Sequence, residues 1–320
     1  MKHKFFVGLP HQKVHSKFIH SLIGGDFVEY RCGVDETEFS SRILAHDAED
    51  VIWFFNDIYY NLHPRLKGRQ VLVGHGFGLG WFMLPRRVEM VNRYFDRVFD
   101  TGYTPEKLNL ENRGVDVKKI RQTGYTLLFE VPDLPVEPGR VLFASAFFNG
   151  WNHHKNLIEI LRHLDSGIQA ALTVHPETPM AVQEMFESMC IGRTNITYVK
   201  TQEQLLQEMA RCACAVGQIS SVMAPFYYRN KPVILLRGHI GRNPLKGIGW
   251  GRVRSEIEDP LFVRILDEST RVSRWRQFSP ETLRNAKVSA SSRKIFYPIN
   301  FDREATASLV RRCVEELSCR

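Results

Sequence analysis

Short apolar runs rich in β-branched and aromatic residues alternate with amphipathic segments along this chain, and that alternation constrains its fold more than any other feature. In the first half it predicts strands at residues 4–8, 51–56, 71–75 and 97–101, with helices at 15–23 and 85–94. In the second half it predicts strands at 141–147, 170–174, 196–199, 213–216 and 233–236, separated by helices at 154–164, 179–189, 202–211 and 221–228. Strands that alternate with helices in this way form parallel sheets, so we predict an α/β protein.

A proline-rich segment at 131–139 separates the two halves, with three prolines and one glycine in nine residues. Such a sequence is typical of a stiff, extended connector, and we place the hinge there. The chain has 320 residues, more than one hydrophobic core usually supports. We therefore predict two Rossmann-like lobes, residues 1–131 and 139–320, with a terminal helix at 305–317 in the second lobe. Two such lobes facing a central cleft constitute the GT-B architecture, although kinases, binding proteins and dehydrogenases also contain two α/β lobes.

Positive charge is concentrated in the second half of the chain. Residues 1–150 contain 19 Lys and Arg against 18 Asp and Glu, a surplus of +1, and the remaining residues contain 24 against 17, a surplus of +7. A surplus confined to one lobe indicates an anionic ligand, which can be nucleotide phosphates, nucleic acid or an anionic membrane surface. The sequence contains no zinc-knuckle, helix-turn-helix or RNP-like signature, so we expect no nucleic-acid partner.

The sequence predicts neither a membrane-spanning helix nor an exported, disulfide-bonded protein. The longest nearly apolar stretch, residues 141–148, is shorter than the roughly 18 residues that a spanning helix needs. The apolar run near the N-terminus is too short for a signal peptide, so we expect a cytoplasmic protein with its six cysteines reduced. Cys212-Ala213-Cys214 has one intervening residue where common zinc sites have about two to four, so we predict no metal there.

The strand predicted in the first lobe after residue 70 runs into a glycine-rich segment that contains a histidine. Gly74, His75, Gly76 and Gly78 lie together there, and glycines allow the backbone to approach a ligand closely. Because parallel sheets bind ligands at the carboxyl ends of their strands, we predict His75 as a general base that deprotonates a hydroxyl. The alternative is a histidine that only caps a turn.

Three segments of the second lobe carry candidate ligand-binding residues. His175 follows a predicted strand, where it either contacts a ligand or is a satisfied turn histidine. Ser220 and Ser221 open a predicted helix, where they bind phosphate or serve as plain N-caps. Asn152 and Lys155 lie in a predicted loop that either holds a diphosphate or is a solvated basic loop.

Several short motifs occur in the order and spacing of a known family: Gly74-His75-Gly76, His175-Pro176, Ser220-Ser221-Val222-Met223, Asn230-Lys231-Pro232-Val233-Ile234 and Phe301-Asp302-Arg303-Glu304-Ala305-Thr306-Ala307. Together they resemble the CDP-glycerol glycerophosphotransferase family, relatives of the teichoic-acid and capsule polymerases with a GT-B fold. Gly124-Tyr125-Thr126 looks like the segment that closes the first lobe in that family.

The resemblance implies a transferase. It would move a polyol phosphate or a sugar from a CDP- or UDP-linked donor to a hydroxyl of a cell-surface glycan, such as a teichoic-acid-like polymer, capsule or lipopolysaccharide. The resemblance also implies that His75 acts on the acceptor and that His175, Ser220 and Ser221 hold the donor phosphates. With a lipid-linked acceptor, we expect peripheral association with the inner face of the cell membrane through basic surface.

Three positions depart from the family's pattern: its Lys is Gly80 here, its Asp before the serine pair is Gln218, and its acid after that pair is Pro225. The acidic position serves hydroxyls of the donor in the family, so the identity of the donor stays open. We expect no metal or other cofactor, because helix dipoles, Ser, His and Lys or Arg can supply the positive potential for the leaving phosphate. The alternatives are an isomerase like the nucleotide-sugar 2-epimerases and a non-catalytic nucleotide-binding module.

Overall fold

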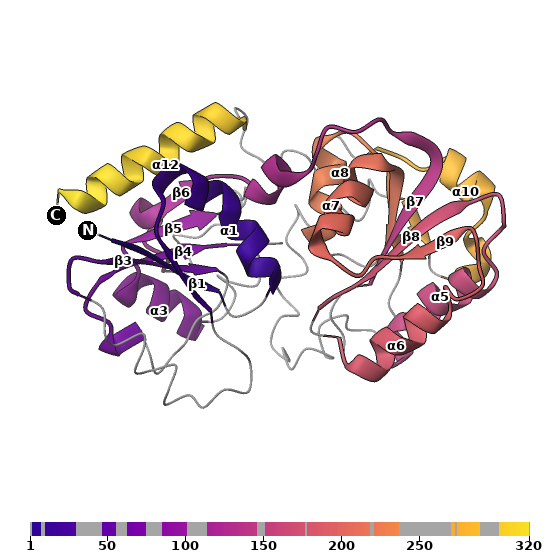
Figure 1. The fold of residues 1–320 in the computed structure, drawn as a ribbon, viewed down its shortest axis with the longest axis horizontal. Helices are drawn as coiled ribbons and strands as arrows, with labels where there is room; N and C mark the ends of the chain where they lie inside the picture. The colour runs from indigo at the N-terminus through magenta and orange to yellow at the C-terminus, as the bar shows by residue number, and fades with distance from the viewer. Residues whose placement is uncertain are drawn as a thin grey trace. The chain divides into compact units, whose positions relative to one another are not determined.

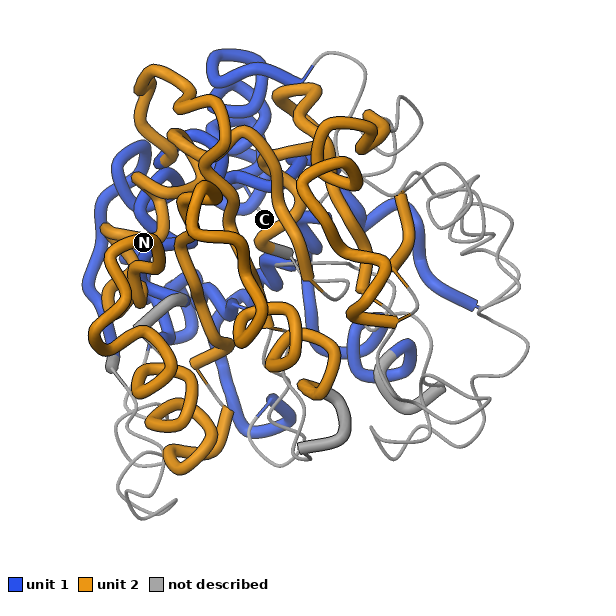
Figure 2. The backbone as a smooth tube through the Cα atoms, turned by 90° about the vertical axis from the view of Figure 1, so that its right-hand side faces the viewer, with its two compact units in different colours: residues 1–130, 294–320 blue, residues 131–293 orange. Residues whose placement is uncertain are grey.

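The computed structural model describes residues 2–7, 10–29, 47–55, 63–74, 85–100, 114–145, 151–176, 178–217, 221–236, 270–272, 274–288 and 301–319. The chain divides into two compact units, shown in blue and orange in Figure 2. Unit 1 consists of Met1–Glu130 and Lys294–Arg320, and unit 2 consists of Val131–Arg293.

Unit 1 contains, within the described residues, a six-stranded parallel sheet in the order β2-β1-β3-β4-β5-β6 (Figure 1). The strands are β1 (His3–Val7), β2 (Asp26–Glu29), β3 (Val51–Phe55), β4 (Arg69–Val73), β5 (Arg97–Asp100) and β6 (Ile120–Gln122). The helices are α1 (Pro10–Ile23), α3 (Pro85–Tyr94) and α12 (Arg303–Ser318), with 3₁₀ turns η1 (His63–Arg65), η4 (Val117–Lys119) and η5 (Thr126–Glu130). The four predicted strands of this half are all present, whereas the short edge strands β2 and β6 were not predicted.

The centre of the unit 1 sheet is a continuous apolar run. All five residues of β3 are buried, as expected for a parallel strand covered on both faces. The ring of Trp53 in β3 stacks on that of Phe5 in β1, with 5.8 Å between their centroids. Burial of these rings away from water is the main stabilising contribution to this layer.

The structure corrects the placement of the terminal helix, which we predicted in the second lobe. Ala307, Val310, Cys313 and Leu317 on α12 are buried in the same cluster as Trp53, so this helix belongs to unit 1. It packs beside α1 (Figure 1). The spacing of these apolar residues shows which face of the helix is buried, but it contains no information about which sheet covers that face.

Unit 2 contains, in its described part, a six-stranded parallel sheet in the order β12-β11-β10-β7-β8-β9. The strands are β7 (Glu137–Ser145), β8 (Gln169–Val174), β9 (Ile196–Tyr198), β10 (Cys212–Gly217), β11 (Val233–Leu236) and β12 (Thr270–Val272). The helices are α5 (Trp151–Arg162), α6 (Met180–Ser188), α7 (Gln202–Arg211), α8 (Ala224–Tyr228) and α10 (Pro280–Arg284), with 3₁₀ turns η6 (Ser221–Met223) and η9 (Trp275–Gln277). The α/β prediction is confirmed for both halves.

The end of the proline-rich connector is part of the unit 2 sheet. Glu137 is the first residue of β7, and Gly139 has a φ of +83°, a left-handed conformation that favours glycine. At this place the register between β7 and β10 shifts, because Cys212 pairs with Glu137 and Cys214 with Val141. The connector therefore ends in a β-bulge rather than running extended to residue 139.

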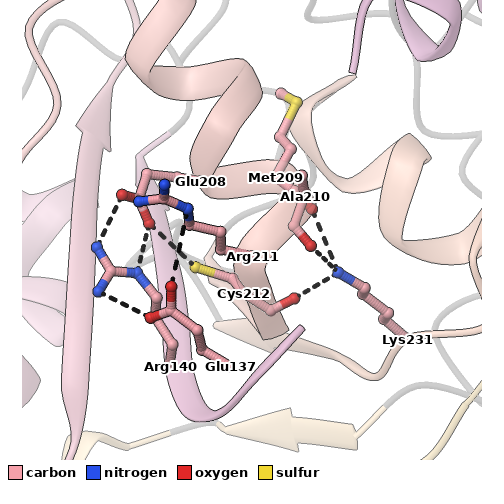
Figure 3. Close-up of polar contacts among 8 residues, drawn as sticks. All are labelled: Glu137, Arg140, Glu208, Met209, Ala210, Arg211, Cys212 and Lys231. Carbon is pink, nitrogen blue, oxygen red and sulfur yellow. Dashed lines mark hydrogen bonds and ion pairs between the residues drawn. The ribbon is translucent and has the colours of Figure 1, made fainter. Parts of the chain in front are cut away.

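The amino edge of the unit 2 sheet carries a partly buried polar cluster (Figure 3). Arg140 donates two hydrogen bonds to the carboxylate of Glu208, both 2.7 Å long. Helix α7 runs into β10 with no residue between them, so its last carbonyls have no turn of their own to cap them. Lys231 supplies the cap, with Nζ 2.7 Å from the carbonyl oxygens of both Ala210 and Cys212.

Candidate functional site

Three adjacent strands end side by side at the carboxyl edge of the unit 2 sheet. The central strand β7 ends at Ser145, its neighbour β10 ends at Gly217, and its other neighbour β8 ends at Val174, directly before His175. Open parallel sheets bind ligands at this edge, in the crevice outside the strand ends. The topology thus brings His175 to the same edge as the segments that follow β7 and β10.

His175 is half-buried in a turn that connects β8 to α6. Its carbonyl oxygen accepts a hydrogen bond from the amide of Thr178 at 2.9 Å, and the side chain of Gln183 donates to the carbonyls of Pro176 and Thr178 at 3.2 and 2.6 Å. Burial lowers the pKa of His175 to about 4, so the imidazole is neutral near pH 7. It can donate or accept a hydrogen bond, and its contact with the donor phosphates remains a prediction.

The segment considered as a basic loop around Asn152 and Lys155 is helical from residue 151 onward. Helix α5 begins three residues before the predicted start at residue 154, so Asn152 also lies in its first turn. Lys155 is exposed, and the side chain of Asn152 lies outside the described residues.

His154, one residue before Lys155, is fully buried. Its Nδ1 lies 2.8 Å from the hydroxyl of Ser145, so this contact ties the end of β7 to the first turn of α5. The ring of His154 also packs edge-on against Phe186 of α6, with 5.5 Å between centroids. Sequence analysis placed His154 at the start of a helix but did not select it, because its partners Ser145 and Phe186 lie on other elements of the fold.

The helix predicted to open at Ser221 starts later in the structure. A 3₁₀ turn begins at Ser221, and α8 follows from Ala224 with Met223 at its N-cap and no side-chain cap. Ser220 and the side chain of Ser221 lie outside the described residues. Helix capping by these serines at α8 is therefore not observed, and their contact with phosphate remains a prediction.

The end of β10 approaches β7 so closely that only glycine fits. A Cβ atom at Gly217 would lie 2.0 Å from the carbonyl oxygen of Ala144, far below any normal contact. Sequence analysis did not select this glycine, although its position directly before Gln218 and the serine pair gave a signal. A strand glycine marks such a close backbone approach.

In unit 1, the described residues reach the candidate acceptor segment only at Gly74. Its amide donates to the carbonyl of Phe99 at 2.8 Å, which extends the pairing of β4 with β5 by one residue. His75, Gly76 and Gly78 lie outside the described residues. Their proposed role as a catalytic segment therefore remains a prediction.

The structure gives Gly124 a packing role. Its φ is +68°, and a Cβ atom there would lie 2.3 Å from the ring of Phe301. Phe301 precedes Asp302, whose carboxylate accepts a hydrogen bond from the amide of Ala305 at 2.7 Å and so caps α12. The Gly124 and Phe301 motifs thus meet where the terminal helix docks on unit 1.

Asp100 is a buried acid that sequence analysis passed over. It is the last residue of β5, beside the end of β4, and it is 2% exposed. Its carbonyl accepts hydrogen bonds from the amide and hydroxyl of Thr123 at 3.0 and 3.2 Å. A carboxylate directly after Val98 and Phe99, at the carboxyl end of the strand, was the available signal, because acidic side chains are rarely buried.

The described ranges contain no group of three or more His, Cys, Asp or Glu side chains arranged to hold a metal ion. None of the helices in these ranges combines the length and the apolar character needed to span a bilayer.

No protein-family model and no curated protein matches the chain. Solved structures do match it over nearly its whole length. A Staphylococcus aureus MnaA structure with UDP has a TM-score of 0.60 at 12% identity, covering 99% of this chain and 97% of that one. The wall teichoic acid polymerase TagF has a TM-score of 0.59 at 12% identity, covering 98% and 90%. The UDP-GlcNAc 2-epimerase from Neisseria meningitidis, bound to UDP-GlcNAc, has a TM-score of 0.56 at 10% identity, covering 99% and 100%.

These similarities show that the chain has the GT-B fold. At such low identity the fold is all that they show, because one fold supports several reactions. The neighbours include both a polymerase and epimerases, and several were crystallised with nucleotides or nucleotide sugars.

Proposed function

We propose that this protein is a GT-B transferase that moves a polyol phosphate or a sugar from a nucleotide-diphosphate donor to a hydroxyl of a cell-surface glycan. The observation that carries the proposal is the position of His175, which follows β8 at the carboxyl edge where the predicted phosphate-binding segments also begin. TagF, a wall teichoic acid polymerase, shares the fold and supports this class of reaction.

In this proposal unit 2 binds the donor. Ser220, Ser221 and Asn152 donate hydrogen bonds to the diphosphate, and the exposed Lys155 supplies positive charge. His175 is neutral in the free protein, so it acts first as a hydrogen-bond donor. A bound phosphate would favour the protonated imidazole and raise its pKa, because an opposite charge stabilises the charged form.

Unit 1 would then serve the acceptor. His75, flanked by Gly74, Gly76 and Gly78, would take the proton of the acceptor hydroxyl while the oxygen attacks the donor and the nucleotide leaves. Such general-base catalysis typically contributes about 10²- to 10⁴-fold in rate. The acceptor is a glycan or a lipid-linked glycan in this scheme.

An epimerase is the second candidate function, and Asp100 favours it. An epimerase needs acid and base groups at the sugar, and the buried carboxylate of Asp100 ends β5 beside the end of β4. The fold is also shared with MnaA and with the Neisseria enzyme, a UDP-GlcNAc 2-epimerase.

Incubation with CDP-glycerol, UDP-GlcNAc and UDP-glucose separates the two reactions. A transferase releases CMP, or UDP from a sugar donor, in proportion to added glycan acceptor, whereas an epimerase converts the sugar and releases no nucleotide. Binding of these nucleotides with neither product formed would favour the non-catalytic module.

Three variants test the residue assignments. His75→Ala should lower the transfer rate by about 10²- to 10⁴-fold with nearly unchanged nucleotide affinity. His175→Ala and Ser221→Ala should weaken nucleotide binding as well. His163→Ala is the matched control, because His163 is exposed on unit 2 and stacks on Trp275. Full activity of His75→Ala would remove the general-base assignment.

A further inference from the structure

The connection between the two units is held by an arginine on each side. On the unit 1 side, Arg303 donates to the carbonyl of Phe129 at 3.1 Å. The ring of Phe129 also stacks on Phe301 at 4.9 Å and packs against Phe18 at 4.6 Å between centroids. The chain of unit 1 is therefore fixed up to residue 129.

On the unit 2 side, Arg229 donates to the carbonyls of Val131 and Pro132 at 3.3 and 3.2 Å. Arg229 sits directly after α8, and its amide donates to the carbonyl of Pro225 at 3.1 Å. Two residues later, Lys231 is bonded to the end of α7 and the start of β10. The turn that carries Arg229 is thus anchored to the body of unit 2 and can hold the connector in place.

Between the two fixed stretches only Glu130 remains. It is the last residue of η5, and its neighbours on both sides are bonded to different units through their carbonyls. The prolines of the connector lie beyond this point, in a segment attached to unit 2 at Pro132 and again where β7 begins at Glu137. The stiffness of these prolines therefore restricts the chain within unit 2 and not between the two units.

We propose that Arg229 and Arg303 form two latches that confine the flexible part of this crossing to the backbone around Glu130. The hinge is then not the proline-rich segment 131–139, where sequence analysis placed it. This gives a role to two motifs that the proposed reaction does not use, the turn at 229–232 and the start of α12. The inference concerns this crossing and does not depend on which reaction the protein catalyses.

Double electron–electron resonance between labels on the two units tests the proposal. The labels replace the exposed residues Lys67 in unit 1 and Glu203 in unit 2, and they are attached through ketone-bearing amino acids so that the native cysteines stay untouched. The ligand-free protein is measured, so the result is independent of nucleotide binding. The readout is the width of the distance distribution.

Loss of the unit 2 latch should widen the distribution. With Arg229→Gln the free segment grows from residue 130 alone to the seven residues 130–136, and square-root scaling sets an upper limit of about 2.6-fold on the widening. Arg276→Gln is the matched control, because Arg276 is exposed on unit 2 and lies over Trp275. If Arg229→Gln lowers the thermal stability, Arg229→Lys, which keeps the charge, provides the second variant and should give a smaller widening.

Pro135→Gly distinguishes a hinge at Glu130 from a hinge in the proline-rich segment more directly. In the latched protein it should leave the distribution unchanged, because residue 135 lies beyond the latch. In the Arg229→Gln background the same change should widen the distribution further. A widening by Pro135→Gly alone, or an unchanged distribution in Arg229→Gln, would overturn the proposal.

Discussion

Replacing Gly124 by alanine tests how the terminal helix is held to unit 1. Gly124 has a φ of +68°, and a Cβ atom there would lie 2.3 Å from two ring carbons of Phe301. Phe301 is 6% exposed and precedes α12. The alanine therefore meets two separate obstacles, one in its own backbone and one in the ring packed against it.

The two contributions can be separated in magnitude. Holding alanine in the left-handed conformation costs about 1–2 kcal/mol. Displacing the ring costs at most what removal of a buried phenylalanine costs, about 3–5 kcal/mol. We expect Gly124→Ala to lower the free energy of unfolding by about 2–5 kcal/mol, with the amides of α12 becoming less protected from hydrogen exchange.

Urea unfolding of four further proteins completes the experiment: the wild type, Gly114→Ala, Phe301→Ala and the double variant Gly124→Ala/Phe301→Ala. Gly114→Ala is the control for the backbone, because Gly114 has a φ of +77° and open space where a Cβ would lie. It should cost only about 1–2 kcal/mol. In a Phe301→Ala background, Gly124→Ala should also cost only that amount, giving a coupling of about 1–3 kcal/mol between the two sites. Equal costs for Gly124→Ala in both backgrounds would refute the packing argument.

Two other predictions concern buried polar groups. His63 is fully buried with Nδ1 2.6 Å from the side-chain oxygen of Gln70, and burial lowers its pKa to about 4. The stability that its neutral form contributes is complete above about pH 6.5 and is lost as the pH falls to 4, a change of about 3 kcal/mol in the free energy of unfolding. When the free energy of unfolding in urea is measured from pH 4 to 7, it should depend less on pH in His63→Phe than in the wild type. Part of the remaining pH dependence should come from His175. Thr178 is 3% exposed, and its hydroxyl has no hydrogen-bond partner in the part of the chain that the structure describes. Thr178→Val should therefore stabilise the protein by about 1 kcal/mol. Thr123→Val removes a hydroxyl that donates to a backbone carbonyl, so it should destabilise the protein by about as much. Destabilisation by both substitutions would contradict this reasoning.

The strands at the centre of each sheet were predictable from sequence, as was the edge strand β9, predicted at 196–199, whereas the other three edge strands were not. Val51–Phe55 is an unbroken apolar run because parallel strands are covered on both faces. Asp26–Glu29, Ile120–Gln122 and Thr270–Val272 have three or four residues and mixed polarity, because an edge strand is paired on one side only. Charged or amide side chains in these short segments interrupt the β-branched and aromatic run that marked β9.

In the candidate site, the positions of residues along their strands were predictable from sequence, and their surroundings were not. The place of His175 at a strand end followed from the apolar run before it, since position along a strand is a local property. The neutral state of His175 and the burial of His154 depend on residues distant in sequence, so no local pattern contained them. The same holds for α12, whose apolar face was visible but whose partner sheet was not.

The motifs behind the family resemblance divide into two groups with different consequences for function. Lys231 caps α7 at the amino edge of the unit 2 sheet, and Phe301 and Asp302 dock and cap α12 on unit 1. These contacts stabilise the fold of this chain and do not distinguish transfer from epimerisation. In the proposed function, the choice between transfer and epimerisation depends on the carboxyl edges, where His175 follows β8 and Asp100 ends β5. Substitutions there should change the reaction without large losses of stability, whereas substitutions at Lys231 should lower stability and leave the chemistry of the remaining folded protein unchanged.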